Sequence, residues 1–420
     1  MIGFVRRLPV ARGALLLTWM LMLPIGGFGV AQIVSTTVRQ LSGPAEMVDF
    51  VAFYTAGRLL VDDPRHLYDT TTETDLQTVL HAEPKLVLQF WNPPHTALLL
   101  LPLAFLPFGA AYLLMLIANL TCLVGACVLL APRPGRAWHW LLWVLVVPMF
   151  LPVQLGVIMG QLSCVLLFGF AVFVRLWTRG GALRSAMALL AWTTKPQLVP
   201  VLLLSLGCAR RWRTLVLVCA LPVLLTLPVV LVGGPSVVLD YIDLGHGASS
   251  AILTGEGLHL DSGHSLLGLT QWLFGPGWPS SGLTAFGTLG VFVLLGSMWR
   301  GGLHTDARRH LQLALLPLAA VLCSPHVLAY DAATWLASAW LLLTFAREVP
   351  SARRGVLVLL LVGWWGGNLA AFPNVNAVAP WGAFTAIFGL AGMGWLYRRA
   401  APRAAITAID RRERAYPRVA

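Results

Sequence analysis

Long apolar runs limit what this chain can fold into more than any other feature. Stretches of roughly 17 to 25 apolar residues recur between Ala14 and Tyr397, and each can cross a hydrocarbon core of about 30 Å as a helix. Only 11% of the residues are charged, whereas a soluble domain carries about a quarter. The sequence therefore predicts an all-α, polytopic helical membrane protein and excludes a single soluble domain.

The charged side chains separate into two groups of loops. The 24 arginines of the termini and of alternate loops, together with four acidic residues, carry +20, whereas the loops over roughly 35–93 and 233–264 carry −8. By the positive-inside rule, the arginine-rich loops and both termini are predicted to be cytoplasmic, and the two acidic loops to face outward. The net charge of +12 is therefore a topology signal and does not indicate a surface for nucleic acid.

The spacing of the runs predicts about 10 to 12 transmembrane or partial-span helices. Full crossings are expected near 14–34, 109–131, 138–155, 162–177, 214–232, 281–299, 355–372 and 380–397. Together they predict one integral-membrane domain over 1–397, with a first outward loop at 35–93 and a second at 233–264. A basic cytoplasmic tail is expected over 398–420, where it would contact membrane lipids.

Two apolar segments are too short for the crossings that their flanking charges require. Segments 183–207 and 311–346 lie between arginine-marked loops, so each must enter and leave on one side, yet two spans need about 40 residues. Breaks are expected at Thr193–Pro196 and at Ser324–Asp331, where prolines end regular helix. Segments 95–107 and 265–275 are also short, and we expect partial spans there.

The broken segments hold the two residues of Asp, Glu, Lys or Arg type that lie within apolar sequence, Lys195 and Asp331. Irregular backbone at membrane depth is tolerated where it is buried in protein or lines a cavity, and ionisable residues there indicate a functional site. The alternatives are that Lys195 extends to the interface and that Asp331 caps a helix. Gln161 is a further candidate for the cavity lining, although polar contacts between helices are its commoner role.

The first outward loop contains a predicted helix with a carboxylate at its start. Asp49, Phe53, Ala56 and Leu60 would share one face, which is typical of a helix lying at the membrane interface. From spacing alone, a solvated surface charge is the favoured explanation of Asp49.

Metal and cofactor signals are weak. His246, His259 and His264 lie in the second outward loop, but their spacing matches no ligand pair on a helix, so a sugar-binding or flexible loop is favoured. The six cysteines lie in or beside apolar runs, which argues against a disulfide framework or a zinc site. No cofactor or metal site is predicted, and the sequence leaves open whether a divalent ion assists.

An ordered set of short motifs resembles glycosyltransferase family 87, which includes bacterial polyprenol-phosphate-mannose-dependent mannosyltransferases. The set runs from about residue 47 to 345. It comprises Asp49-Phe50, Phe53-Tyr54, Ala56-Gly57-Arg58-Leu59-Leu60, Leu67-Tyr68-Asp69, Asn92-Pro93-Pro94, Pro102–Phe108, Gly160-Gln161-Leu162-Ser163, Lys195-Pro196, Ser324-Pro325-His326 and Tyr330-Asp331. Two places depart from the family pattern, Trp91-Asn92 before the double proline and Asp62-Asp63-Pro64.

The resemblance implies a GT-C type membrane glycosyltransferase that uses a polyprenyl-phosphate-linked sugar donor and a glycolipid or glycan acceptor. It implies a bacterial plasma membrane and a periplasmic active site. By analogy, Asp49 matches the catalytic base of an inverting hexosyl transfer. The implied substrate contacts are Tyr54, Arg58, Gln161, Lys195, His326, Tyr330 and Asp331.

A transporter or flippase for lipids or lipid-linked sugars is the main alternative, because it too would use broken helices and a buried lysine. The sequence shows no clear internal repeat, and a transporter does not need an acidic outward loop. A non-catalytic assembly subunit is a third possibility, and it would be favoured if Asp49 could be lost without effect.

Overall fold

The computed structural model describes residues 9–44, 46, 48–80, 87–131, 146–178, 180–254, 264–300, 305–372 and 379–400. Over these residues the chain forms 17 α-helices and no strand, which confirms the predicted all-helical fold. The α-helices are α2 Pro9–Ser42, α3 Phe50–Asp62, α4 Thr70–Leu80, α5 Pro94–Ala104, α6 Phe108–Leu130, α8 Leu151–Ile158, α9 Ser163–Leu176, α10 Ala182–Thr193, α11 Val199–Cys208, α12 Trp212–Gly233, α13 Ser236–Thr254, α14 Leu266–Phe274, α15 Trp278–Arg300, α16 Asp306–Cys323, α17 Trp335–Glu348, α18 Arg353–Ala371 and α19 Trp381–Arg399.

Four helical segments are long and apolar enough to cross a membrane, namely Phe108–Leu130, Trp212–Gly233, Trp278–Arg300 and Pro350–Ala371. A fifth candidate consists of α8 and α9, which bend by 119° at the short break between them. The chain is therefore a multi-pass membrane protein with four or five candidate spans among its described residues.

The two breaks expected from proline and charge are both present. Helix α10 ends at Thr193, and a 3₁₀ turn at Pro196–Leu198, η3, leads into α11. Helix α16 ends at Cys323, and a second 3₁₀ turn at Ala329–Thr334, η5, leads into α17. The short helices α5 and α14 also lie where partial spans were expected.

Two sequence predictions were wrong in part. Separate crossings were expected at 138–155 and 162–177, but α8 and α9 form a sharply bent pair because irregular backbone at 159–162 joins them; residues 132–145 lie outside the described residues. The second acidic loop was expected to be a sugar-binding or flexible loop, but α13 occupies 19 residues of it. His246 is exposed on α13, His264 is buried before α14, and His259 lies outside the described residues.

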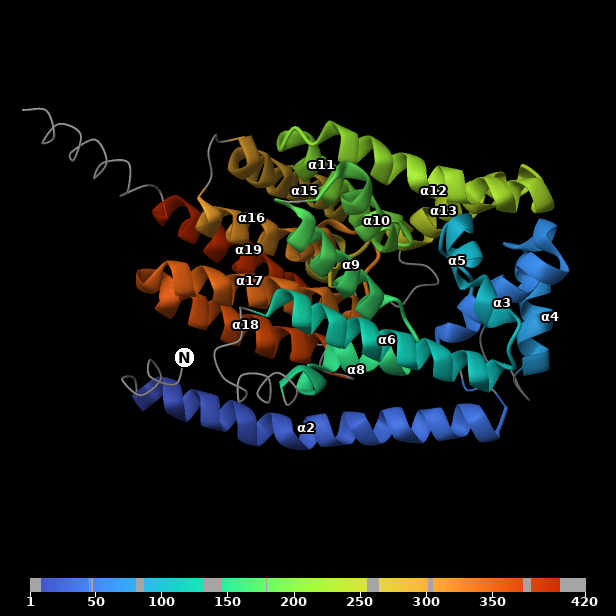
Figure 1. The fold of residues 1–420 in the computed structure, drawn as a ribbon, viewed down its shortest axis with the longest axis horizontal. Coiled ribbons are helices and arrows are strands. Elements are labelled where there is room, and N and C mark those ends of the chain that lie inside the picture. The colour runs from blue at the N-terminus through green and yellow to red at the C-terminus, as the bar shows by residue number, and fades with distance from the viewer. Residues whose placement is uncertain are drawn as a thin grey trace, which may run out of the picture.

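The helices run mostly along one direction (Figure 1), with α2 lying along one side of the bundle. Helix α2 begins and α19 ends at the left of that view, whereas α3 and α4 lie at the right. This arrangement places α3 and α4 at the end of the bundle opposite the start of α2 and the end of α19.

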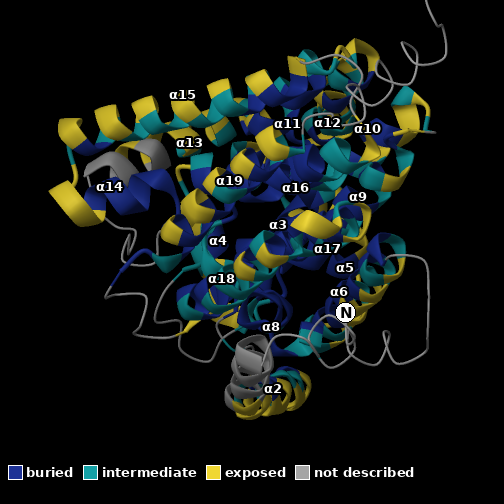
Figure 2. Cartoon of the chain, turned by 90° about the vertical axis from the view of Figure 1, so that its left-hand side faces the viewer, coloured by how far each residue is buried: buried dark blue, intermediate teal, exposed yellow. Residues whose placement is uncertain are grey.

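Apolar side chains cover the outer surface as well as the core. Figure 2 shows exposed residues along α2 and α15 and buried ones along α16 and α17. Helix α16 is buried from Leu311 to Leu322, whereas Leu231 of α12 is 85% exposed and Phe286 of α15 is 76% exposed. Such an apolar exterior is expected of a protein that packs against lipid, because lipid tails are as apolar as the core.

Candidate active site

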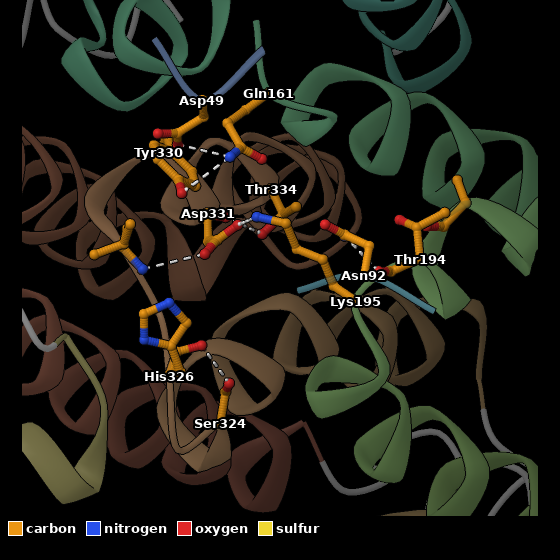
Figure 3. A network of polar contacts seen from close by, with 12 residues as sticks. Asp49, Asn92, Gln161, Thr194, Lys195, Ser324, His326, Tyr330, Asp331 and Thr334 are labelled. Atoms are coloured by element: carbon orange, nitrogen blue, oxygen red, sulfur yellow. Dashed lines mark hydrogen bonds and ion pairs between the residues drawn. The ribbon is translucent and has the colours of Figure 1, made fainter. Parts of the chain in front are cut away.

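The candidate site forms where several helix breaks converge (Figure 3). Asp49 directly precedes α3, Gln161 lies between α8 and α9, and Lys195 lies between α10 and η3. Tyr330 and Asp331 belong to η5. The bundle thus brings polar side chains from four irregular segments to one place, as irregular backbone at membrane depth requires burial in protein.

Lys195 and Asp331 form a buried ion pair. The Lys195 Nζ atom lies 2.5 Å from Asp331 Oδ1, and the two side chains are 8% and 4% exposed. The ammonium group also lies over the Tyr330 ring, 4.7 Å from its centre. The charges of Lys195 and Asp331 therefore neutralise each other. A lysine that extends to the interface, or an aspartate that only caps a helix, does not fully describe this pair.

Asp331 also forms hydrogen bonds within the irregular segment between α16 and α17 in which it lies. Its Oδ2 atom accepts a hydrogen bond of 3.2 Å from the backbone N–H of Leu328, and Thr334 Oγ1 donates to the Asp331 carbonyl at 2.8 Å. These bonds satisfy backbone groups that would otherwise be left unpaired between α16 and α17. The carboxylate is thus committed to one cation and one backbone donor.

Asp49 has different partners. The Gln161 side-chain amide donates to Asp49 Oδ2 at 2.7 Å and to the Tyr330 hydroxyl at 3.1 Å. Asp49 occupies the N-cap position of α3 without a capping hydrogen bond, and it takes part in no salt bridge within the described ranges. The half-buried carboxylate is therefore positioned by neutral groups and remains available for proton transfer.

A glycine fixes Gln161 beside Asp49. Gly160 has a φ of +65°, and a Cβ atom there would lie 2.6 Å from Phe50 Cβ. The backbone N–H of Phe50 donates to the Met159 carbonyl at 2.9 Å, which ties the start of α3 to the α8–α9 break. A left-handed conformation without a side chain is required for this close approach.

Helix α3 is more deeply buried than its sequence pattern indicated. One apolar stripe was expected, but every residue from Phe50 to Gly57 is buried, together with Leu59 and Leu60. Helix α5 packs along it, and Phe50 contacts the rings of Phe108 and Tyr112. A buried α3 gives Asp49 a rigid support, which a helix lying on a membrane surface would not.

His326 lies at the edge of the same group. Its ring stacks on that of Trp91, with centres 6.0 Å apart and planes inclined by 27°. The imidazole is within electrostatic range of Asp331, Lys195 and Asp49, and Ser324 Oγ donates to the His326 carbonyl at 2.9 Å. The His326 imidazole therefore lies within electrostatic range of both the Lys195–Asp331 pair and the Asp49 carboxylate.

The structure does not bring Tyr54 and Arg58 to this group. The Tyr54 hydroxyl donates to the Leu106 carbonyl at 2.9 Å, and Arg58 binds the Ala104 carbonyl and Asp62 at 3.2 and 2.7 Å. Both side chains join α3 to the end of α5. In this structure, Tyr54 and Arg58 therefore serve the packing of α3, although they lie close to Asp49 in the sequence.

Sequence reasoning missed two residues of the site, Trp91 and Asn92. The Asn92 side-chain amide donates to the Thr194 carbonyl at 2.7 Å, next to Lys195, and Trp91 covers His326. The available signal was a polar residue before two prolines in an otherwise apolar region. Within the described ranges, no three His, Cys, Asp or Glu side chains are grouped as metal ligands would be.

Fold and site together define a multi-pass helical membrane protein whose interior presents a carboxylate beside a lysine and an imidazole. The model of glycosyltransferase family 87 matches residues 90–325, which is more than half of the chain. The chain belongs to this family and is therefore a membrane glycosyltransferase. Neither the curated proteins nor the solved structures include a significant match to it.

Proposed function

We propose that this protein transfers a hexose, mannose in the first instance, from a polyprenyl-phosphate sugar to a glycolipid or glycan acceptor. The observation that carries this proposal is that Asp49, which forms no ion pair within the described ranges, belongs to the same polar group as the Lys195–Asp331 ion pair. Membership of glycosyltransferase family 87 supports the transfer reaction, and the resemblance of the motifs to mannosyltransferases supports the donor. The many exposed apolar side chains suit a donor with a polyprenyl tail.

The donor phosphate is proposed to bind between Lys195 and His326. An ammonium group has three N–H donors, and one of them meets Asp331 Oδ1, so two remain for phosphate oxygens. The imidazole of His326 would supply another donor, and hydrogen bonds between charged groups are stronger than those between neutral groups. Gln161 and Tyr330 would contact the sugar or the acceptor, since both lie against Asp49.

Asp49 is proposed to act as the general base. The acceptor hydroxyl gives its proton to the carboxylate while its oxygen forms a bond to the anomeric carbon of the sugar. The bond from that carbon to the phosphate oxygen breaks, and its electron pair leaves with the polyprenyl phosphate. The leaving group is an anion that Lys195 and His326 stabilise, so a general acid is not required. One direct displacement inverts the anomeric configuration.

The active site is proposed to open to the outer face of a bacterial plasma membrane, with both termini cytoplasmic. The charge division of the loops supports this orientation, as does the location of α3 and α4 at the end opposite the start of α2 and the end of α19. Tyr54 and Arg58 bind α5 and Asp62, so they are not included in the proposed site.

The test is a transfer assay with the purified full-length protein in lipid nanodiscs. Radiolabelled polyprenyl-phosphate mannose, and then other hexoses, are supplied with a bacterial lipid extract as acceptor. Wild type and Asp62→Asn, which alters an exposed carboxylate at the end of α3, should transfer label, and Asp49→Asn should not. Transfer by Asp49→Asn would remove Asp49 as the base, and an absence of transfer with every donor would favour a transporter.

A further inference from the structure

Helix α4, in the predicted outward loop, buries polar side chains and exposes an apolar one. Glu73 and Gln77 lie one turn apart on the same face and are both 0% exposed, whereas Val79 is 83% exposed. Burying a carboxylate and an amide is unfavourable unless they form hydrogen bonds. Glu73 and Gln77 therefore need hydrogen-bond partners on the segment that α4 covers.

Those partners are backbone groups of residues 88–90. Gln77 binds Leu88 twice, because its amide donates to the Leu88 carbonyl at 2.8 Å and its oxygen accepts from the Leu88 N–H at 3.0 Å. Glu73 Oε1 accepts from the Phe90 N–H at 3.2 Å. Two side chains of α4 thus act on this segment as a neighbouring strand would, since they satisfy alternate backbone groups.

Tyr68 extends this row of contacts by one more residue. Its hydroxyl donates to the Asn92 carbonyl at 2.8 Å, and its ring stacks on Phe90 with centres 5.8 Å apart. Residues 88, 90 and 92 are therefore all held from the α4 side. Gln89 also binds α4, because its side-chain amide donates to Thr70 Oγ1 at 2.6 Å. Trp91 instead stacks on His326.

We infer that Glu73 and Gln77 are positioning residues for the transfer reaction. They hold residues 88–92 so that Trp91 packs against His326 and Asn92 reaches the Thr194 carbonyl beside Lys195. Neither residue touches the candidate site, and their effect passes through the backbone of Leu88 and Phe90. This inference rests on the proposed function.

The surroundings of Glu73 favour a neutral carboxyl group, so the hydrogen bond of this side chain matters more than its charge. Burial raises the pKa of its carboxyl from 4.5 to about 7, the hydrogen bond from Phe90 opposes this rise, and Asp69 adds to it. The neighbouring Tyr68 is the other titratable group in contact range. No arginine or lysine pairs with Glu73 within the described ranges. A neutral side chain of the same shape should therefore serve as well.

The first test measures the backbone contacts without any substrate. Hydrogen exchange of the full-length protein in nanodiscs, followed by mass spectrometry, reports on the amides of Leu88 and Phe90. Glu73→Ala and Gln77→Ala should each speed exchange in peptides covering 88–92 by about tenfold or more. Glu73→Gln should retain protection, because its side-chain oxygen can still accept from Phe90. The matched control is Asp75→Ala, an exposed acid on the same helix. Unchanged exchange in both alanine variants would overturn the inference.

The second test asks whether the effect on transfer passes through Trp91. Glu73→Ala should lower kcat by about 10- to 100-fold, the scale expected when a catalytic contact is misplaced by about 1 Å, and Glu73→Gln should restore it. In a Trp91→Ala background, Glu73→Ala should add little further loss, because the residue it positions is already absent. Independent, multiplicative losses would mean that Glu73 does not act through Trp91, and the positioning role would be wrong.

The two proposals fail in different ways. If the wild-type protein transfers no sugar from any donor, the proposed function is wrong, and with it any role of Glu73 in transfer, whatever the exchange data show. If the wild type transfers sugar but Glu73→Ala and Gln77→Ala keep the wild-type kcat, only the positioning role is wrong. Melting curves for each variant identify any that fail to fold, and Glu73→Gln then decides the question through its retained activity.

Discussion

Two aspartates of one site, at the start of α3 and in the break before α17, lie in opposite electrostatic settings. Asp331 has a lysine at 2.5 Å and a backbone donor, and it is 3% exposed. Asp49 is half-buried and has an amide as its hydrogen-bond partner. A carboxylate bound to a cation is a poor proton acceptor, because the cation favours its ionised form. This difference is the reason why we propose Asp49, and not Asp331, as the general base.

The largest expected effect is the loss of transfer in Asp49→Asn. General-base catalysis contributes about 10²- to 10⁴-fold, so kcat should fall within that range while the melting temperature stays nearly constant. Radiolabel transfer and thermal unfolding of the same preparation measure the two quantities. A variant that melts much earlier than wild type would show that Asp49, like Asp331, is mainly structural.

The second prediction concerns stability at the other aspartate. Asp331→Asn leaves Lys195 buried without a partner and should lower the free energy of unfolding by about 3–5 kcal/mol. The double variant Lys195→Met with Asp331→Leu should regain most of that loss, yet it should not transfer sugar. The control is Asp306→Asn. The exposed Asp306 carboxylate pairs with Arg309, so this variant should lower the free energy of unfolding by about 1 kcal/mol or less. Activity in the double variant would contradict the role of Lys195.

Gly160→Ala tests whether the partner of Asp49 depends on the local backbone. Alanine at a φ of +65° is unfavourable by about 1–2 kcal/mol, and the close approach of Phe50 adds overpacking. We expect a loss of about 2–4 kcal/mol in stability and a lower kcat. Gly181→Ala is the control, because no atom lies within 4 Å of a Cβ there. Equal behaviour of the two variants would show that the α8–α9 break tolerates a side chain.

Glu73 is a third carboxylate of interest, which is more deeply buried than Asp49 and, like Asp49, has no cationic partner within the described ranges. Its folded-state pKa of about 7 lies above the ordinary 4.5, so the folded state binds more protons between these values. Stability should therefore fall as pH rises from about 4.5 to 7 and stay reduced above that, by about 1–3 kcal/mol. Melting curves at pH 6 and pH 8 should differ less for Glu73→Gln than for wild type. An equal difference would mean that Glu73 stays ionised.

The smallest effect is expected at Arg58, a cation near Asp49 in sequence but outside the site. Its contacts are the Ala104 carbonyl and the exposed Asp62. Arg58→Ala should change stability by about 1 kcal/mol or less and the transfer rate by less than about threefold. A much larger rise in KM for the donor would place Arg58 at the phosphate.

The sequence predicted the breaks better than their contacts. Proline and charge were sufficient to locate the interruptions near Lys195 and Asp331, because both features act locally on a helix. Their pairing across 136 residues depends on how the segments pack, which local patterns do not contain. Glu73 was missed for a related reason, since a glutamate on a polar helix is indistinguishable from a solvated charge until its burial is known.

Tyr54 and Arg58 illustrate the limit of motifs. They lie within a motif that begins at Asp49, yet they are five and nine positions along a helix and point towards α5. In the sequence, Trp91 stands out only as a departure from the family pattern, and its contact with His326 is visible only in three dimensions. Neighbours in sequence and neighbours in the site are therefore different sets in this protein.

One site is proposed to hold a donor phosphate on Lys195 and His326 and an acceptor hydroxyl on Asp49. A cryo-EM structure of the full-length Asp49→Asn protein in nanodiscs, with polyprenyl-phosphate mannose bound, would show both positions at once. The phosphate should lie within hydrogen-bond distance of Lys195 Nζ, and the anomeric carbon should face residue 49. A phosphate bound among the arginines at the opposite end of the bundle, or a sugar facing away from residue 49, would contradict it.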